Sequence, residues 1–231
     1  TAFAAGSGAA RKNFDVNASV GHFVRAAYVP SAGLLLCGGD WTGKVTGLDP
    51  ASGEARFTAA HIGVDSINSL VYAPDAGVML CGSGWTGNVS AFDPATGEMR
   101  FAVDAGVGEY ARSAYAAGPK LGIFAGGGAR GKVSGVDPSS GDVRYTVDPG
   151  IGAIWSLLSV PEGPLLCGGS WSRPSEVGRV AGLDPATGAT LFDVDPAVGK
   201  YVVMAHAEVE GGDLVLCGGD AGAVAGLDPT S

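Results

Sequence analysis

The sequence predicts an all-β fold built from repeated four-stranded antiparallel units, and three observations support this prediction. First, one eight-residue phrase occurs five times, beginning at Gly43, Gly87, Gly131, Gly178 and Gly222. Its aspartate returns in steps of 44, 44, 47 and 44 residues. Second, each repeat contains four apolar stretches separated by turn residues. A fixed period of this length is typical of repeat proteins, whose units bury their cores only against one another.

Composition is the third observation. The 231 residues include 40 Gly and 13 Pro, and 46% of them are hydrophobic while only 16% are charged. Such a composition is typical of short strands joined by tight turns. The length suits a single all-β domain that buries roughly 70 to 75% of its unfolded surface. We therefore expect one domain over 1–231, with repeats at about 22–59, 65–103, 109–147, 153–194 and 200–231, the last completed by 11–16.

The second repeat shows the elements of one unit in order. Strands are expected over 67–73, 78–81, 88–92 and 98–103. The turn between the third and fourth strands reads Asp-Pro-Ala-Thr-Gly, in which Asp caps the turn, Pro presets φ and Gly supplies a left-handed residue. Four antiparallel strands in about 44 residues are typical of a β-propeller blade.

The two ends of the sequence complement each other. The fifth copy stops at Ser231, before its fourth strand, whereas 13–16 aligns with the fourth strands at 100–103 and 191–194. This alignment predicts that the N-terminal strand completes the last blade and removes an open sheet edge. The expected fold is therefore a five-bladed β-propeller of four-stranded antiparallel blades, closed by its N-terminal strand.

This chain resembles two repeat families. The stretch 71–84, with Pro74, Asp75 and Gly77 at its turn, resembles the WD40 repeat, and 87–97 is similar to the repeat of quinoprotein (PQQ-like) propellers. The resemblance implies propeller architecture over nearly the whole chain. The WD40 tryptophan is replaced at every copy, by Leu48, Phe92, Val136, Leu183 and Leu227. The metal and cofactor ligands of quinone enzymes are not found, so we expect no cofactor.

Charge and hydropathy exclude several classes of function. The formal net charge is −9 and the sequence pI is 4.6, and Lys and Arg are scattered along the chain. Nucleic acid is therefore not an expected partner, because phosphate binding needs clustered cations. No apolar run reaches the roughly 18 residues of a membrane span, so we expect a soluble protein without membrane insertion. The compartment stays open, either the cytoplasm or an organelle reached by a cleaved targeting peptide.

Cysteine and histidine give no sign of a metal site or of disulfides. Cys37, Cys81, Cys167 and Cys217 fall at one repeat position, where the third repeat is expected to have Ala125. Equivalent positions in different blades lie too far apart for the Cα spacing of about 5.5 Å in a disulfide. We expect small buried thiols. The three histidines form no paired ligand motif, so no metal is predicted.

The loops between the second and third strands are the best candidates for a binding face. Trp41, Trp85 and Trp171 stand there in three blades, and Ala129 and Ala221 in the other two. Tryptophan at such tips anchors protein partners or stacks on sugar rings, although each ring can also fold over its own blade. The fourth blade enlarges this loop and adds Arg173 and Glu176, either for a task of its own or by neutral drift.

The leading functional hypothesis is a non-catalytic protein-protein interaction module, a scaffold or an accessory subunit of a larger assembly. The first alternative is a carbohydrate-binding, lectin-like propeller with one Trp site per blade. The second is a small hydrolase with a site in the central channel. Arg25 and Arg112 on the innermost strands are the channel candidates, but no acid or nucleophile accompanies them, so we expect no enzyme.

Overall fold

A computed structural model describes residues 2–3, 10–11, 17–60, 62–127, 131–170, 177–209 and 212–229. These residues form strands and turns and contain no helix. Their strands build five antiparallel sheets in chain order, with four, four, four, four and three strands, and one separate two-stranded sheet. The all-β prediction is therefore confirmed.

Each of the five sheets is a simple meander of consecutive strands. The first contains β3 (His22–Val29), β4 (Leu34–Asp40), β5 (Val45–Leu48) and β6 (Ala55–Ala59). The second contains β7 (Ile67–Ala73), β8 (Val78–Ser83), β9 (Asn88–Phe92) and β10 (Met99–Asp104). The third contains β11 (Arg112–Ala116), β12 (Leu121–Ala125), β13 (Val133–Val136) and β14 (Val143–Val147).

The remaining sheets follow the same plan. The fourth contains β15 (Ala153–Ser159), β16 (Leu165–Ser170), β17 (Arg179–Leu183) and β18 (Thr190–Val194). The fifth has three strands, β19 (Val203–Val209), β20 (Gly212–Gly218) and β21 (Val224–Leu227). The separate sheet pairs β1 (Ala2–Phe3) with β2 (Ala10–Arg11).

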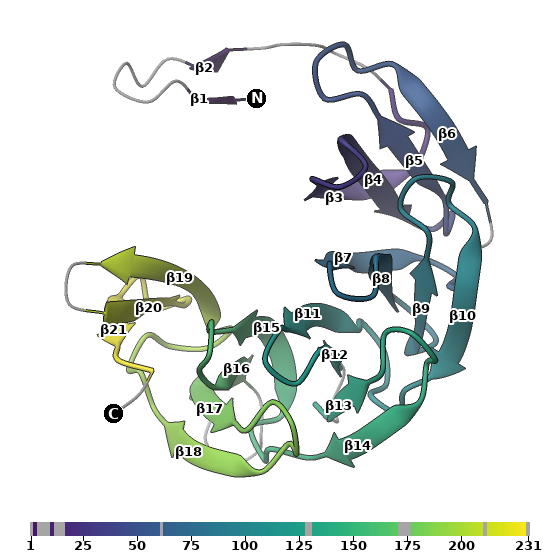
Figure 1. The fold of residues 1–231 in the computed structure, drawn as a ribbon. Coiled ribbons are helices and arrows are strands. Elements are labelled where there is room, and N and C mark those ends of the chain that lie inside the picture. The colour runs from purple at the N-terminus through teal and green to yellow at the C-terminus, as the bar shows by residue number, and fades with distance from the viewer. Residues whose placement is uncertain are drawn as a thin grey trace.

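The five sheets stand side by side along an arc (Figure 1). The first strand of each sheet lies on the inner side of the arc, and the fourth strands β6, β10, β14 and β18 lie on the outer side. Successive inner strands contact one another, from β3 through β7, β11 and β15 to β19. This radial arrangement of meanders is consistent with a propeller.

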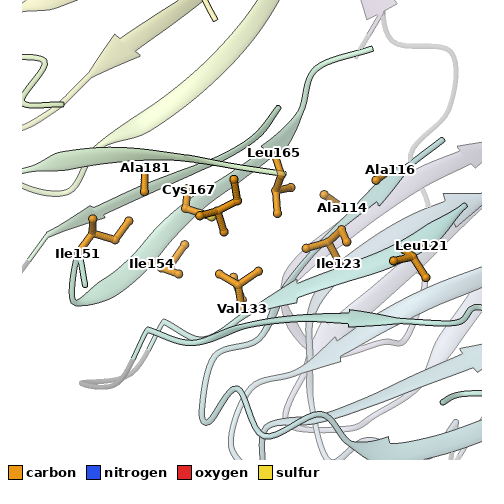
Figure 2. Packing of buried hydrophobic residues seen from close by; sticks show 12 residues of the cluster. Ala114, Ala116, Leu121, Ile123, Val133, Ile151, Ile154, Leu165, Cys167 and Ala181 are labelled. Carbon is orange, nitrogen blue, oxygen red and sulfur yellow. The ribbon is translucent and has the colours of Figure 1, made fainter. Parts of the chain in front are cut away.

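Apolar residues that alternate along the strands fill the space between neighbouring sheets. Figure 2 shows the layer between the third and fourth sheets, where Ile123 and Val133 face Leu165 and Cys167. Similar clusters join the other neighbours. Side chains alternate between the two faces of a strand. The second, third and fourth sheets therefore each pack one face against the preceding sheet and the other face against the following sheet.

The Asp-Pro turns have the predicted hairpin geometry. The carboxylate of Asp137 accepts hydrogen bonds from the backbone N–H groups of Ser139 at 2.9 Å and Ser140 at 3.3 Å, and Gly141 is left-handed, with φ of 83°. Its second oxygen accepts a bond from the Arg144 guanidinium at 2.7 Å. This guanidinium, together with the turn N–H groups, lowers the pKa of Asp137. The recurrence of Arg seven residues after the turn aspartate, as at Asp137 and Arg144, was the available signal for this ion pair.

The four cysteines are buried and free, as predicted. The expected place of Ala125 beside them is wrong. In strand pairing, Cys81 lies opposite Ser90, whereas Phe124 lies opposite the equivalent Ser134 and Ala125 lies opposite Val133. Measured between these paired positions, the hairpin from β12 to β13 is one residue longer than that from β8 to β9, and this shifts the alignment of the third repeat by one position. Phe124 therefore takes the place of the cysteines in the third sheet.

The predicted closure of the ring is not observed among the described residues. The arc is open between the fifth and first sheets (Figure 1). Arg11 pairs with Ala2 instead of β21, and residues 12–16 lie outside the described residues. Val224 is 74% exposed, although its equivalents in the other four sheets are fully buried, namely Val45, Val89, Val133 and Val180. The outward face of the fifth sheet is thus uncovered in the described part of the chain.

Candidate interaction site

A hollow of about 310 Å³ lies between the first and second sheets, at the end where their second and third strands are joined. Four aromatic residues, a cation and an amide are among its lining residues. The lining residues are Phe23, Arg25, Trp41, Ser66, Ile67, Asn68, Gly84, Trp85 and Tyr110. Two of the predicted tryptophans therefore share one hollow instead of forming a separate site on each blade.

Trp41 stands at the tip of the β4–β5 hairpin and is 70% exposed. Its ring and that of His22 form an edge-to-face pair, with centroids 6.5 Å apart. The tip is held to the segment before β3, because the Thr42 hydroxyl donates a hydrogen bond to the Val20 carbonyl at 2.7 Å. The indole therefore projects from a fixed backbone with most of its surface in solvent.

Trp85 occupies the same place on the β8–β9 hairpin and is 51% exposed. Its ring lies 5.6 Å from that of Tyr110, centroid to centroid. Tyr110 belongs to the loop leading into the third sheet, and its N–H donates to the carbonyl of Gly84 at 2.9 Å. This backbone bond places the two rings side by side.

Three of the aromatic residues around the hollow have left-handed backbones. The φ angles are 47° for Phe23, 71° for Trp41 and 56° for Tyr110. A bulky residue at positive φ is strained, and such strain is concentrated at functional sites. Tyr201, with φ of 55°, repeats the arrangement at the fifth sheet, where it contacts Trp155. The sequence analysis missed Phe23 and Tyr110, and the available signal was an aromatic residue two positions before both Arg25 and Arg112.

Irregularities at the start of the inner strands bring further side chains to the hollow. The pairing of β3 with β4 shifts register between His22 and Arg25, and that of β7 with β8 shifts between Ile67 and Ser69. Phe23 and Asn68 lie within these shifts. Bulges of this kind redirect side chains and are common next to binding sites.

Arg25 is the only arginine among the described residues that line this hollow. Its Nε donates to the carbonyl of Asn68 at 2.8 Å, and a terminal nitrogen makes a long 3.4 Å contact with the carbonyl of Phe23. The Asn68 amide in turn donates to the carbonyl of Ala111 at 3.2 Å. These bonds connect the first three inner strands beneath the aromatic rings.

Arg112, the second predicted channel residue, stands at the same register level as Arg25. Arg25 lies opposite Gly38 and Arg112 opposite Ala125, which the shifted third hairpin places at the position of Gly38. The Nε of Arg112 is buried without a hydrogen-bond partner, as is the indole N–H of Trp155. Burial lowers the pKa of Arg112, and the charge of Arg25 lowers it further.

The remaining residues of the predicted binding face lie mostly outside the described part of the chain. Trp171, Arg173 and Glu176 lie outside the described residues, as does Ala129. Ala221 is exposed at the fifth sheet. The enlarged fourth hairpin therefore remains a prediction.

Larger hollows lie at the opposite end of the sheets. One of about 430 Å³ is lined by the turns around Pro119 and Pro161 and by Asp184 and Pro185, and another of about 550 Å³ surrounds Asp137 and Arg144. Their polar groups are largely those that build the turns. We therefore regard the aromatic hollow as the better candidate, because its rings are exposed without such a structural task.

The described residues contain neither a group of three or more His, Cys, Asp or Glu side chains placed to hold a metal ion nor a helix able to cross a membrane. The hollow itself offers hydroxyl, amide, guanidinium and aromatic groups. These groups bind by hydrogen bonds, charge and stacking.

Comparison with solved structures supports the propeller repeat. The chain is similar to BamB from Moraxella catarrhalis, with 18% identity and a TM-score of 0.64 over 89% of this chain and 61% of that one. It is similar to Sqt1 from Saccharomyces cerevisiae, with 16% identity and a TM-score of 0.66 over 86% and 56%. A quinohemoprotein alcohol dehydrogenase from Comamonas testosteroni gives 17% and 0.60 over 80% and 38%.

These structures are propellers of the quinoprotein-like and WD40-like kinds, which agrees with the resemblance in the repeats. No family model matches the sequence, and no curated protein matches it. The chain spans less than two thirds of the length of each of these structures. At such low identity the likeness concerns the fold alone.

Proposed function

We propose that this protein is a non-catalytic interaction module that binds a protein partner through the aromatic hollow between its first two sheets. The observation that carries this proposal is the exposure of Trp41 and Trp85 on two rigid hairpins that share one hollow. Large rings that are already ordered lose little entropy on binding, which is why Trp and Tyr are enriched at interface hot spots. Strain at Trp41 gives independent support.

A role in chemistry has less support. The hollow combines one guanidinium with an amide, a serine and aromatic rings, and this set lacks the base that would activate Ser66. The likeness to an alcohol dehydrogenase concerns the fold. We therefore assign the site to recognition, as part of a scaffold or accessory subunit in a larger assembly.

The proposal is tested by site-specific photocrosslinking in the native source. A benzophenone amino acid replaces Trp41 in one variant and Ala51, in a turn at the opposite end of the first sheet, in a control variant. The expected result is a discrete crosslinked protein from position 41 that is not obtained from position 51. Equal capture from both positions, or none from position 41, would contradict the proposed site.

Carbohydrate binding is the second candidate, and the stacking surface offered by Trp41 favours it. A sugar that covers this ring changes tryptophan fluorescence. Titration of the wild-type protein and of Trp41→Ala with a broad glycan panel distinguishes the candidates, because only a lectin gives a response that the substitution abolishes.

We also propose that the chain forms one propeller domain of five blades, completed by the segment 11–16. Support comes from Gly226, which is exposed, whereas the equivalent glycines are covered by an aromatic ring of the fourth strand. The alignment puts Phe14 at that ring position. The test is a double-mutant cycle of Phe14→Ala and Gly226→Ala in urea unfolding. Coupling supports closure, and additivity contradicts it.

A further inference from the structure

Most of the described arginine side chains in this acidic protein have a carboxylate partner. Arg56, Arg100 and Arg144 each bind the aspartate of their own hairpin turn at 2.7 or 2.8 Å. Arg179 binds both oxygens of Asp193 at 2.7 Å. Among the described arginine side chains, only Arg25 and Arg112 make no ion pair. Both belong to inner strands, and Arg25 lines the aromatic hollow.

The bonds of Arg25 orient its guanidinium without neutralising it. Backbone carbonyls of Asn68 and Phe23 occupy the Nε and one terminal nitrogen. The other terminal nitrogen has no partner in the described part of the chain. No carboxylate is among the described residues that line the hollow. The site thus holds a positioned cation whose counter-charge is not supplied by its own walls.

We propose that the hollow recognises a carboxylate side chain, Asp or Glu, in a segment of the partner protein, and that an adjacent apolar side chain of this segment packs against Trp41 and Trp85. This inference rests on the proposed interaction function and specifies the chemistry of the partner. The guanidinium has the planar donor geometry that matches a carboxylate. Aromatic walls exclude water from the ion pair and thereby strengthen it.

A single carboxylate suits the site better than a phosphate. One guanidinium lines the hollow, and the net charge of the chain is −9, so a dianion would bring an uncompensated charge to an already acidic protein. Arg112 stands at the same level two inner strands away and adds to the positive potential beneath the rings. Its field favours an anion without offering a second set of donors in the hollow.

Two matched peptides test the inference. Each is an acetylated and amidated pentapeptide, with Glu between Phe and Leu in one and Gln in the same place in the other. Binding to the whole chain is measured by calorimetry and by tryptophan fluorescence, to which Trp41 and Trp85 contribute. The Glu peptide is expected to bind with a Kd on the order of 10⁻⁴ M. The Gln peptide is expected to bind about tenfold more weakly, because it lacks the charge-assisted bonds.

Variants of Arg25 identify the group responsible. Arg25→Met should abolish the preference for Glu, and Arg25→Lys should retain part of it, because lysine keeps the charge and loses the planar fork. Arg56→Met, on an outer strand, is the matched control and should leave the preference unchanged. Circular dichroism shows whether each variant is folded. Partial retention of the preference in Arg25→Lys would further show that the loss in Arg25→Met comes from the missing charge and not from misfolding.

The outcomes separate this inference from the proposed function. Equal binding of both peptides, or a preference that survives in Arg25→Met, would overturn carboxylate recognition and leave an apolar docking site. No binding of either peptide up to about 10⁻³ M would also overturn it. The photocrosslinking at position 41 tests the interaction function independently of the charge of the partner.

Discussion

The ring of Tyr145 lies against the bare Cα of Gly135, its neighbour across the pairing of β13 with β14. A Cβ on Gly135 would overlap the ring. The ring cannot easily move away, because its hydroxyl donates a hydrogen bond to the carbonyl of Pro185 in the next sheet at 3.0 Å. Gly135→Ala should therefore lower the free energy of unfolding by about 1 to 3 kcal/mol, as overpacking does.

Urea unfolding of Gly135→Ala, compared with two other variants, checks this prediction. Gly182→Ala should cost less, because Phe192 opposite it has no hydroxyl to tether its ring. Gly118→Ala, where a Cβ meets no atom within 4 Å, should be close to neutral. Equal effects of all three substitutions would contradict the argument from the ring.

The left-handed backbone of Trp41 predicts an unusual ranking of substitutions. Asn tolerates positive φ better than Ala does, and both remove the indole. Trp41→Asn should therefore be more stable than Trp41→Ala by about 1 kcal/mol. At position 85, where φ is not positive, Asn should give no such advantage. Thermal unfolding of the four variants measures both differences.

Phe124 provides a test of the revised register. Replacing it with the cysteine found at the equivalent position of the other sheets should destabilise the protein by about 2 to 4 kcal/mol, because the buried ring leaves a cavity. If cysteine at this position instead increased stability, as substitutions toward the repeat consensus often do, the register of β12 with β13 would be wrong. Chemical denaturation of Phe124→Cys under reducing conditions decides between them.

Acid should remove the contribution of the Arg144–Asp137 pair. Folding lowers the pKa of Asp137 below its ordinary value of about 3.9, so the pair stabilises the folded protein above this pH and loses its effect as the pH falls through the folded value. Arg144→Met should thus lower the urea midpoint near pH 7, and its difference from the wild type should shrink as the pH falls through the folded pKa of Asp137. Asp137 should titrate at a higher pH in the variant, which carbon-detected NMR measures directly. An unchanged titration would contradict the pairing.

The repeat phrase was sufficient to predict the sheet order, because its Gly, Asp and Pro specify local turn geometry. The aromatic hollow could be predicted only in part. Trp41 and Trp85 were identified from their hairpins, but Phe23 and Tyr110 reach the same place through positive φ angles that depend on contacts between sheets. The position of Phe124 was missed because one inserted residue shifts pairing without interrupting the repeat.

Val224 and Leu216 belong by sequence to an apolar layer, yet the described residues leave both exposed, at 74% and 41%. The fifth sheet is therefore held mainly through its other face, by the cluster it shares with the fourth. In an array of stacked units, such an end unit opens first and independently of the rest. Amide hydrogens of β20 and β21 should exchange faster than those of β12 and β13. Their exchange rates measure the free energy with which this end of the array opens.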